Sequence, residues 1–364
     1  EFFKALALFR DGDLPGALRE AKALSEKYPD NVEPLKLMAA CHLAANQWEQ
    51  ARQYLDQALK IKPDDASAVK NLARLDVMDG DPAKARGLLE GLIKAHPTDT
   101  DAQVLLARVV ESMEGPAPAI TALEQALERN PEALAVRSEL ARLYVQSGQP
   151  QRVIELTREL TDKDIARQPS LLEKRGKALL ATGDADAAMR EFKRLLELFP
   201  KSAPAHFAYS ESLAVAGKRI EATAELKRAV ELNPSYLPAR VGQVRLKVFD
   251  NDLEGAKQAL AALRKEFGDA REVLDVEGWF ALGTGDYATA AARYGELFEG
   301  RPSSGLLVLY ARALWGQQKY DEAISRMESW LKDRRGDVAV EMQLADSYLA
   351  RERSADARAI YKQV

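Results

Sequence analysis

Residues 66–99 read ASAVKNLARLDVMDGDPAKARGLLEGLIKAHPTD, and the features of this stretch recur along the whole chain of 364 residues. Apolar residues such as Val69 and Leu72 fall at the three- and four-residue spacing of an amphipathic helix. Gly80 then indicates a turn, because glycine just past a helix end takes the left-handed conformation without strain. A second helical pattern follows and ends before Pro97, since proline cannot continue a helix. The stretch therefore predicts a helix, a tight turn and a second helix.

Two small residues mark every row of about 34 residues, and we place them where paired helices cross and their backbones approach closely. The early ones are Ala5, Ala39, Ala73, Ala107, Ala141, Gly176, Ser210, Val244, Gly278, Ala311 and Ala345. The late ones are Ala17, Ala51, Ala85, Ala119, Val153, Ala188, Ala222, Ala256, Ala290, Ala323 and Ala357. Proline closes most rows, at Pro29, Pro63, Pro97, Pro131, Pro200, Pro234 and Pro302.

We expect one continuous array over residues 1–364, with one hairpin in each row. The rows lie near 1–31, 32–65, 66–99, 100–133, 134–168, 169–202, 203–236, 237–270, 271–303, 304–337 and 338–364. Their phase slips by one residue around 162–168, where the closing proline is missing, and again near 303–305. A solenoid needs polar caps at both ends, and neither end has one. We therefore expect a fragment of a longer array whose bare ends associate with each other.

The period, the small residues at the crossings and the closing proline resemble the tetratricopeptide repeat (TPR) family, and the resemblance covers the entire chain. It implies an all-α fold, an α-solenoid that winds as a right-handed superhelix of about eleven helical hairpins. It also implies a concave groove lined by the first helix of each hairpin, with row positions 2, 5, 9, 12 and 13 facing it.

Composition narrows the function classes. The chain is 46% hydrophobic and 30% charged, with a net charge of −4, so its bulk charge does not favour nucleic acid or an anionic membrane as a partner. The single cysteine, Cys41, excludes an internal disulfide. The three histidines lie in separate rows without a paired acid or thiol at ligand spacing. We therefore expect no catalytic residues, no metal site and no cofactor, and interpret the chain as a binding scaffold rather than an enzyme.

Basic side chains recur at the predicted groove positions of the first rows. At ninth positions they are Arg74, Arg108, Arg142 and Lys177, with Lys36 and Lys70 at fifth positions, and Arg245 and Arg312 follow later. Neighbouring first helices lie about 8–10 Å apart, so stacked cations would repel unless carboxylates or an anionic ligand intervene. One hypothesis is thus a ladder for an anionic ligand. The other is that local carboxylates neutralise the cations, since Glu111 lies three residues after Arg108 and Glu139 three before Arg142.

Aromatic residues occupy groove positions in the later rows, namely Phe207, Phe249, Trp279 and Trp315. An aromatic face can stack on a sugar ring or hold an apolar peptide side chain. The alternative is that these rings fill gaps between repeats as part of the core. The candidate ligand-binding residues of the groove are therefore Lys36, Lys70, Arg74, Arg108, Arg142, Lys177, Arg245, Trp279, Arg312 and Trp315.

Within the TPR family, the last third looks like the TPR-repeat lipoproteins of bacterial PEP-CTERM/exosortase exopolysaccharide systems. The residues that carry this resemblance are Pro302-Ser303-Ser304, Arg312-Ala313-Leu314, Asp321-Glu322-Ala323, Glu328-Ser329-Trp330-Leu331-Lys332 and Leu344-Ala345-Asp346-Ser347-Tyr348-Leu349. The resemblance implies a periplasmic, outer-membrane-associated scaffold in exopolysaccharide biosynthesis, export or PEP-CTERM protein sorting. Its partners would be proteins of that system or an anionic polysaccharide. Any membrane attachment would run through a lipid anchor upstream of residue 1.

Two other functions stay open. One is a cytoplasmic peptide-binding TPR adaptor. The carboxylate clamp of its chaperone-binding members is not favoured. Lys36 and Asn71 match two of its five positions, but Ala40, Asp101 and Leu105 stand where the clamp has asparagine, lysine and arginine. The other is the substrate-recruiting arm of a larger glycosyltransferase. A lipobox cysteine after a signal peptide would indicate the periplasmic scaffold, and a neighbouring catalytic domain would indicate the recruiting arm.

Overall fold

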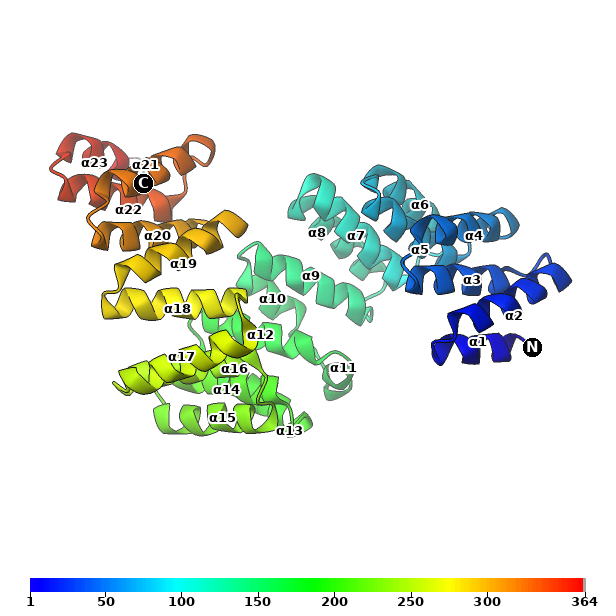
Figure 1. The fold of residues 1–364 in the computed structure, drawn as a ribbon, viewed down its shortest axis with the longest axis horizontal. Coiled ribbons are helices and arrows are strands. Elements are labelled where there is room, and N and C mark those ends of the chain that lie inside the picture. The colour runs from blue at the N-terminus through cyan, green and yellow to red at the C-terminus, as the bar shows by residue number, and fades with distance from the viewer. Residues whose placement is uncertain (363–364) are drawn as a thin grey trace. The chain divides into compact units, whose positions relative to one another are not determined.

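The structure is a computed structural model that describes residues 1–362, and within them every regular element is a helix (Figure 1). In chain order the helices are α1 Phe2–Arg10, α2 Leu14–Lys27, α3 Val32–Ala44, α4 Trp48–Ile61, α5 Ala66–Met78, α6 Pro82–Ala95, α7 Thr100–Glu114, α8 Pro116–Arg129, α9 Leu134–Gln146, α10 Pro150–Leu156, α11 Asp162–Arg167, α12 Pro169–Ala181, α13 Ala185–Leu198, α14 Ala203–Val215, α15 Arg219–Leu232, α16 Leu237–Phe249, α17 Leu253–Phe267, α18 Arg271–Thr284, α19 Tyr287–Gly300, α20 Ser304–Gly316, α21 Tyr320–Asp333, α22 Val338–Ala350 and α23 Ser354–Tyr361. The prediction of an all-α solenoid built from helical hairpins is thus confirmed.

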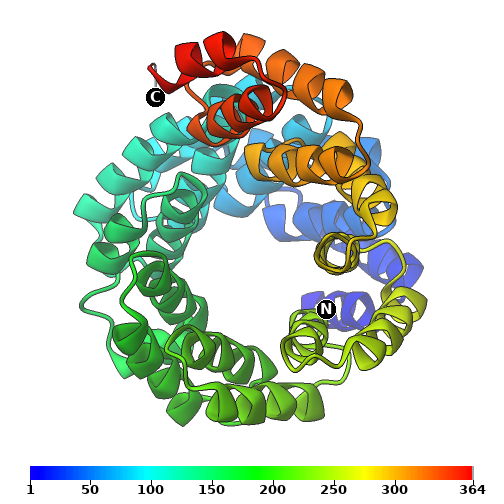
Figure 2. The same cartoon turned by 90° about the vertical axis from the view of Figure 1, so that its left-hand side faces the viewer.

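The hairpins form because small residues stand where the two helices of a pair cross. All of the early and late small residues named above are buried in the structure. At Gly176 of α12 there is room for nothing larger, since an added Cβ would lie 2.4 Å from Cζ of the buried Phe192 ring on α13. Figures 1 and 2 show paired helices running side by side in opposite directions. The close approach of their backbones follows from these small side chains.

A left-handed residue joins the two helices in most hairpins. Gly80 and Gly183 have φ angles of +82° and +85°, as expected from the Gly-Asp turns. The aspartate that follows begins the second helix, because Asp81 Oδ1 accepts a hydrogen bond from the backbone N–H of Lys84. Four rows place a residue other than glycine at the left-handed position, with φ between 57° and 61°: Asn46, Asn251, Gln318 and Glu352.

One row departs from the two-helix pattern, where the sequence carries an extra residue. The second helix of this row, α10, is only 7 residues long, and the short helix α11 follows it. Thr161 caps α11, since its hydroxyl accepts from the backbone N–H of Asp164 while the Asp164 carboxylate accepts from the backbone N–H of Thr161. Arg194 of α13 then donates to Asp162 and to the Leu160 carbonyl. The sequence alone did not predict this additional helix.

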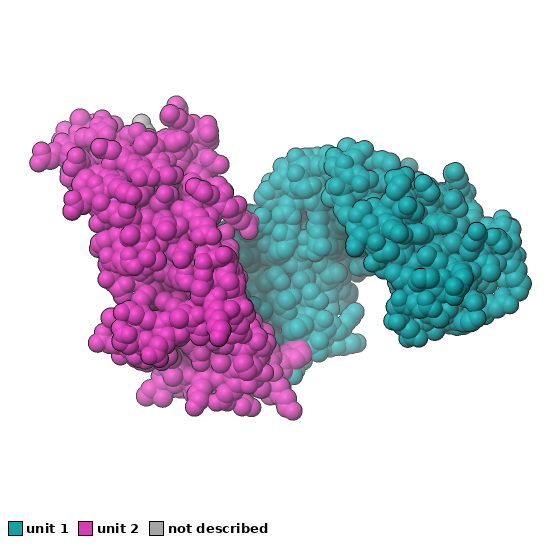
Figure 3. Space-filling view, in the orientation of Figure 1, with its two compact units in different colours: residues 1–198 teal, residues 199–364 magenta. Residues whose placement is uncertain are grey.

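The chain divides into two compact units, Glu1–Leu198 and Phe199–Val364 (Figure 3). The core of the first unit includes Leu35 and Leu55, and that of the second includes Tyr294 and Leu307. Continuity of the array over 1–364 stays a prediction, and residues 363–364 of the last predicted row lie outside the described part. Over residues 1–362, none of the helices combines the length and the apolar character required to cross a bilayer.

Candidate functional site

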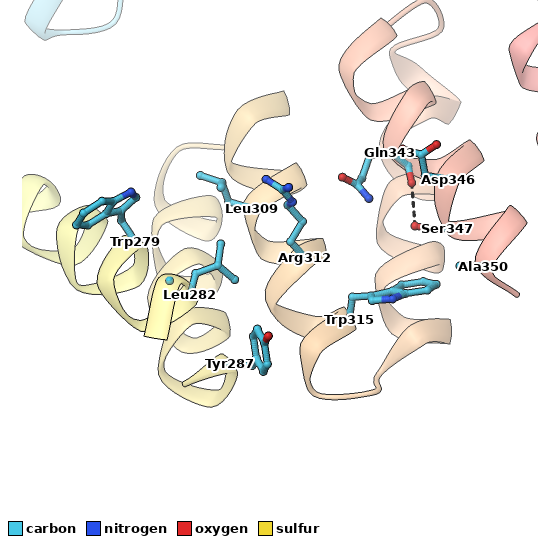
Figure 4. A pocket seen from close by; sticks show the side chains of 11 residues that line it. Trp279, Leu282, Tyr287, Leu309, Arg312, Trp315, Gln343, Asp346, Ser347 and Ala350 are labelled. Carbon is cyan, nitrogen blue, oxygen red and sulfur yellow. Dashed lines mark hydrogen bonds between the residues drawn. The ribbon is translucent and has the colours of Figure 1, made fainter. Parts of the chain in front are cut away.

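A cavity of about 660 Å³ opens in the second unit along three successive first helices, α18, α20 and α22 (Figure 4). Its walls are mainly apolar, with Trp279 and Leu282 from α18 and Leu309 and Trp315 from α20. Such a volume lies in the range of ligand-binding clefts, and aromatic walls with a few polar groups are typical of them. The cavity is therefore a candidate binding site of this unit.

Three of the predicted groove residues meet in this cavity: Trp279, Arg312 and Trp315. Trp279 follows Gly278, where an added Cβ would lie 3.1 Å from the ring of the buried Tyr294. The close packing of α18 on α19 at this point leaves the neighbouring indole on the open side, where it is 36% exposed. Trp279, which the sequence predicts to face a groove, thus lies on the wall of the cavity.

The rings of the cavity are held by their neighbours. Trp315 meets Tyr320 edge to face, with ring centroids 4.6 Å apart. The ring of Tyr287, at the start of α19, packs against Gly316, where an added Cβ would lie 2.3 Å from the ring. Rigid aromatic surfaces lose little conformational entropy on binding. This wall is therefore preorganised for a ligand.

Arg312 is an exposed cation on the wall formed by α20, between Trp279 and Gln343 in Figure 4. Its side chain forms no hydrogen bond or ion pair with any residue in 1–362. The carboxylate on the far wall, Asp346, is already engaged, because its Oδ1 accepts a hydrogen bond of 2.6 Å from the Tyr361 hydroxyl. The cavity thus holds a cation without an ion-pair partner in residues 1–362 and, on another helix, the carboxylate of Asp346, among aromatic and aliphatic side chains.

Arg245 of α16 lies beside the cavity rather than on its wall. Its guanidinium carbon is 5.9 Å from the centroid of the Trp279 ring, and its Nη2 is 3.4 Å from Asp275 Oδ2. Phe249, at the end of the same helix, is 76% exposed, with the Arg219 guanidinium 5.1 Å from its ring centroid. Neither side chain lines the cavity that Trp279 enters.

Phe207 fills a gap between repeats, which was the alternative to a groove position. It is partly buried against the core of α15 and α16, and its ring meets Tyr236 edge to face at a centroid distance of 5.9 Å. Its role is therefore packing between repeats.

Most of the predicted basic groove residues of the first unit are bound by carboxylates. Lys36 Nζ lies 3.3 Å from Asp65 Oδ2, and Lys70 Nζ lies 3.1 Å from Asp99 Oδ2. Asp65 and Asp99 also cap α5 and α7, since each accepts a backbone N–H. Burial alone would raise the pKa of Asp99, but these hydrogen bonds and Lys70 lower it below the ordinary value of 3.8. The two lysines therefore join a row to the next one.

Arg108 and Arg142 form a network with two carboxylates. Arg108 donates from Nε and Nη2 to Glu139 at 2.9 and 3.0 Å, and Arg142 Nε donates to Glu139 at 3.0 Å. Glu111 binds Arg142 across the two rows and not Arg108, so the local pair expected between Arg108 and Glu111 is not the one that forms. The expected pair of Arg142 with Glu139 does form. The network supports the hypothesis that carboxylates neutralise these cations.

Of the remaining predicted residues, Lys177 binds Glu173 at 2.6 Å, as its spacing suggests. Arg74 donates a hydrogen bond of 2.9 Å to the Asn71 amide oxygen. Among the eight predicted basic groove residues, only Arg74 and Arg312 form no ion pair within residues 1–362. Arg312 also has aromatic neighbours in the cavity, so it is a stronger candidate than Arg74 for binding a ligand.

The sequence missed part of the cavity wall. Leu309 and Gln343 both lie at the sixth position of their rows, which is outside the predicted groove positions, and Tyr287 begins a second helix. Leu282 is at a twelfth position, so it was already included by the position rule, in which row positions 2, 5, 9, 12 and 13 face the groove. The sequence signal for open space here was glycine at the thirteenth position of two successive rows, Gly283 and Gly316. Other rows carry a side chain at this position.

The described residues 1–362 contain no group of three or more histidine, cysteine, aspartate or glutamate side chains arranged to hold a metal ion. Cys41 is buried, and burial raises the pKa of its thiol. A second cavity of about 560 Å³ is lined by α17, α18 and α19, and there Arg264 and Arg293 share the carboxylate of Glu277. These arginines are already paired, unlike Arg312.

Comparison with known proteins agrees with the repeat pattern. Profiles described as tetratricopeptide repeat match residues 8–75, 116–165, 169–212, 276–338 and 309–364. No curated protein sequence matches the chain.

Two solved structures share the fold at 15% sequence identity. The crystal structure of yeast Tom70 is similar at a TM-score of 0.54, covering 99% of this chain and 90% of that one. The Cut9 and Hcn1 hetero-tetramer of the APC/C is similar at a TM-score of 0.50, covering 99% of this chain and 79% of that one. At this identity the likeness concerns the fold alone.

Proposed function

This chain belongs to the tetratricopeptide repeat family, and from that premise we propose that it is a non-catalytic scaffold that binds a partner protein in the cavity along α18, α20 and α22. The observation that carries the proposal is the unpaired Arg312 between Trp279 and Trp315. Tryptophan, tyrosine and arginine are the residues that most often dominate protein–protein binding energy. Trp315 also packs, partly buried, against the core of this unit, whereas Trp279 is 36% exposed.

The exposure of Trp279 supports a role in binding rather than in packing. Trp279 is 36% exposed, whereas the core residues Leu307 and Tyr294 of the same unit are fully buried. Covering exposed ring surface with a partner removes apolar area from water, which is favourable by about 25 cal/mol per Å². The open aromatic wall is thus a surface that a partner would stabilise.

We propose further that the partner belongs to a bacterial exopolysaccharide biosynthesis, export or PEP-CTERM sorting system, and that the protein is periplasmic and outer-membrane-associated. The support is the sequence resemblance in 302–349, which includes Arg312 and Asp346 of the cavity. A cytoplasmic peptide-binding adaptor and a recruiting arm of a glycosyltransferase are the competing functions. Cell fractionation of the full-length protein after labelling with radioactive palmitate separates these functions. We expect a lipid-labelled protein in the membrane fraction. An unlabelled protein in the cytosolic fraction would contradict the periplasmic proposal.

The binding proposal is tested by affinity capture from cells of the native host. The bait is the full-length chain, and the matched bait carries Trp279→Ala and Trp315→Ala. We expect at least one protein partner that is retained by the wild type and lost from the variant, while both baits keep the same helicity by circular dichroism. Partners retained equally by both baits would place the binding surface outside this cavity and contradict the proposal.

A further inference from the structure

The side chains that line the cavity of the proposed function also indicate which ligand it would accept. Its lining includes six apolar or aromatic side chains: Trp279, Leu282, Tyr287, Leu309, Trp315 and Ala350. They come from three successive repeats and form walls on both sides of Arg312 (Figure 4). A ligand that fills this space must bring apolar groups to the walls and place an acceptor near the guanidinium.

The polar groups of the cavity are few and partly engaged. The Ser347 hydroxyl donates to the Gln343 carbonyl within α22 at 2.8 Å, and Asp346 accepts from Tyr361. Arg312, the Gln343 amide and the Tyr287 hydroxyl are left without a side-chain partner in the described residues. A sugar ring needs several directed hydrogen bonds for its hydroxyls, since a polar group desolvated without a partner costs about 1–3 kcal/mol. Three groups spread over three helices suit a neutral oligosaccharide poorly.

The same groups suit an extended peptide. A glutamine amide can accept from a backbone N–H and donate to a backbone carbonyl, which is the pairing that a peptide main chain offers. A guanidinium presents two parallel N–H donors that match a carboxylate, and such charge-assisted hydrogen bonds are the stronger ones. Aromatic walls on both sides hold an aromatic or long aliphatic side chain.

We propose that this cavity selects an extended segment of its partner in which an aspartate or glutamate stands beside an aromatic or long aliphatic residue. Arg312 binds the acidic side chain, and the apolar side chain lies against Trp279 and Leu309. This inference rests on the proposed function, because it names the partner chemistry of the same site. Arg312 is then the residue that sets specificity, and the tryptophans supply most of the affinity.

The test is selection of random seven-residue peptides displayed on phage, against four forms of the immobilised chain. They are the wild type, Arg312→Glu, the double variant Trp279→Ala with Trp315→Ala, and the control Arg271→Glu. Arg271 is the first residue of α18, is exposed, and does not line the cavity, so its reversal gives the same change in net charge. The unfolding midpoint of each form, followed by circular dichroism, verifies that the fold is retained.

The wild type and Arg271→Glu should enrich the same acidic-plus-aromatic or acidic-plus-aliphatic sequences, and Arg312→Glu should shift the enrichment toward lysine or arginine. A synthetic peptide of the enriched sequence should lose about tenfold or more in affinity when its acid is replaced by the matching amide, as expected for a charge-assisted pair. It should lose a similar factor with Arg312→Ala.

Other outcomes overturn the inference in separable ways. If the wild type and Arg312→Glu enrich the same sequences, the acid preference is wrong while peptide binding stands. If the wild type enriches nothing beyond the tryptophan double variant, the proposed function and this inference fail together. If an oligogalacturonate probe binds with dependence on Arg312 and no peptide does, the ligand is an acidic saccharide and the peptide assignment is wrong.

Discussion

Arg108 binds Glu139 of the following repeat through two hydrogen bonds of 2.9 and 3.0 Å. The carboxylate is 5% exposed and also accepts from Arg142, so one buried acid ties two first helices together. This relationship distinguishes Arg108 and Arg142 from Arg312. Lys36, Lys70, Arg108 and Arg142 of the first unit are part of the joints between repeats, whereas Arg312 of the second unit has no such partner in residues 1–362.

Glu139→Gln should destabilise the protein. The variant removes the negative charge that two arginines share, and hydrogen bonds to charged groups contribute about 1.5–3 kcal/mol each when they are buried. Because the Arg108 side chain is 59% exposed and solvent screens it, we expect a loss of about 1–2 kcal/mol. Urea unfolding followed by circular dichroism measures it. The control is Glu173→Gln, whose pair with Lys177 is exposed and should contribute less than ~0.5 kcal/mol. Equal losses in the two variants would contradict the role of Glu139.

The contribution of Glu139 should depend on pH. Burial alone would raise the pKa of this carboxyl, but the hydrogen bonds from Arg108 and Arg142 lower it below the ordinary value of 4.5. The unfolded chain thus takes up the proton at higher pH than the folded chain does. The stabilisation is fully present above pH 4.5 and is lost as the pH falls through the lower pKa of the folded state. The difference in unfolding free energy between wild type and Glu139→Gln should therefore shrink below pH 4.5, and a constant difference would contradict the assignment.

Gly176→Ala should destabilise the hairpin of α12 and α13. Its new methyl would meet the buried Phe192 ring at 2.4 Å, and overpacking of this kind costs about 1–3 kcal/mol. The matched control is Gly87→Ala in α6, where the added Cβ meets nothing within 4 Å. That variant should be stabilised by about 0.5–1 kcal/mol through helix propensity. Thermal unfolding midpoints that move in the same direction for both would show that the crossing is not where the structure places it.

Gln318→Gly should stabilise the protein. Gln318 has a φ angle of 61°, in the left-handed region that costs a residue with a side chain about 1–2 kcal/mol. Glycine at the same place in other hairpins, such as Gly183, is free of this strain. After the entropy cost of glycine we expect a gain of about 0.5–1 kcal/mol. The reverse change, Gly183→Gln, should destabilise by a similar amount, and chemical unfolding of both variants checks the pair. A loss of stability on Gln318→Gly would mean that this side chain makes a contact that outweighs the strain.

The hairpins could be predicted from sequence because their causes are local. A small residue at each crossing, a left-handed glycine and a closing proline act within one row, and all recur with the same period. The position rule likewise placed Trp279, Arg312 and Trp315 on one surface, because successive first helices repeat the same orientation.

The ion pairs and the cavity wall could not be predicted in the same way. Arg108 and Glu139 are 31 residues apart in sequence, so their contact depends on how one hairpin stacks on the next. The α11 helix is another example, since its place is fixed by Arg194 from the following row. Leu309 and Gln343 enter the cavity from sixth positions for the same reason, because only the packing of α20 and α22 decides which side chains meet there.

Site-specific photocrosslinking tests most directly whether the cavity along α18, α20 and α22 binds a partner. The photoreactive amino acid p-benzoyl-phenylalanine replaces Ala350, an exposed residue of the cavity, or Ala261, an exposed residue of the separate cavity on α17. Both variants of the full-length protein are expressed in the native host and irradiated. We predict a discrete protein adduct from position 350 that disappears with Trp279→Ala and Trp315→Ala, and no such adduct from position 261. Adducts of equal yield at both positions, or none at 350, would contradict the account.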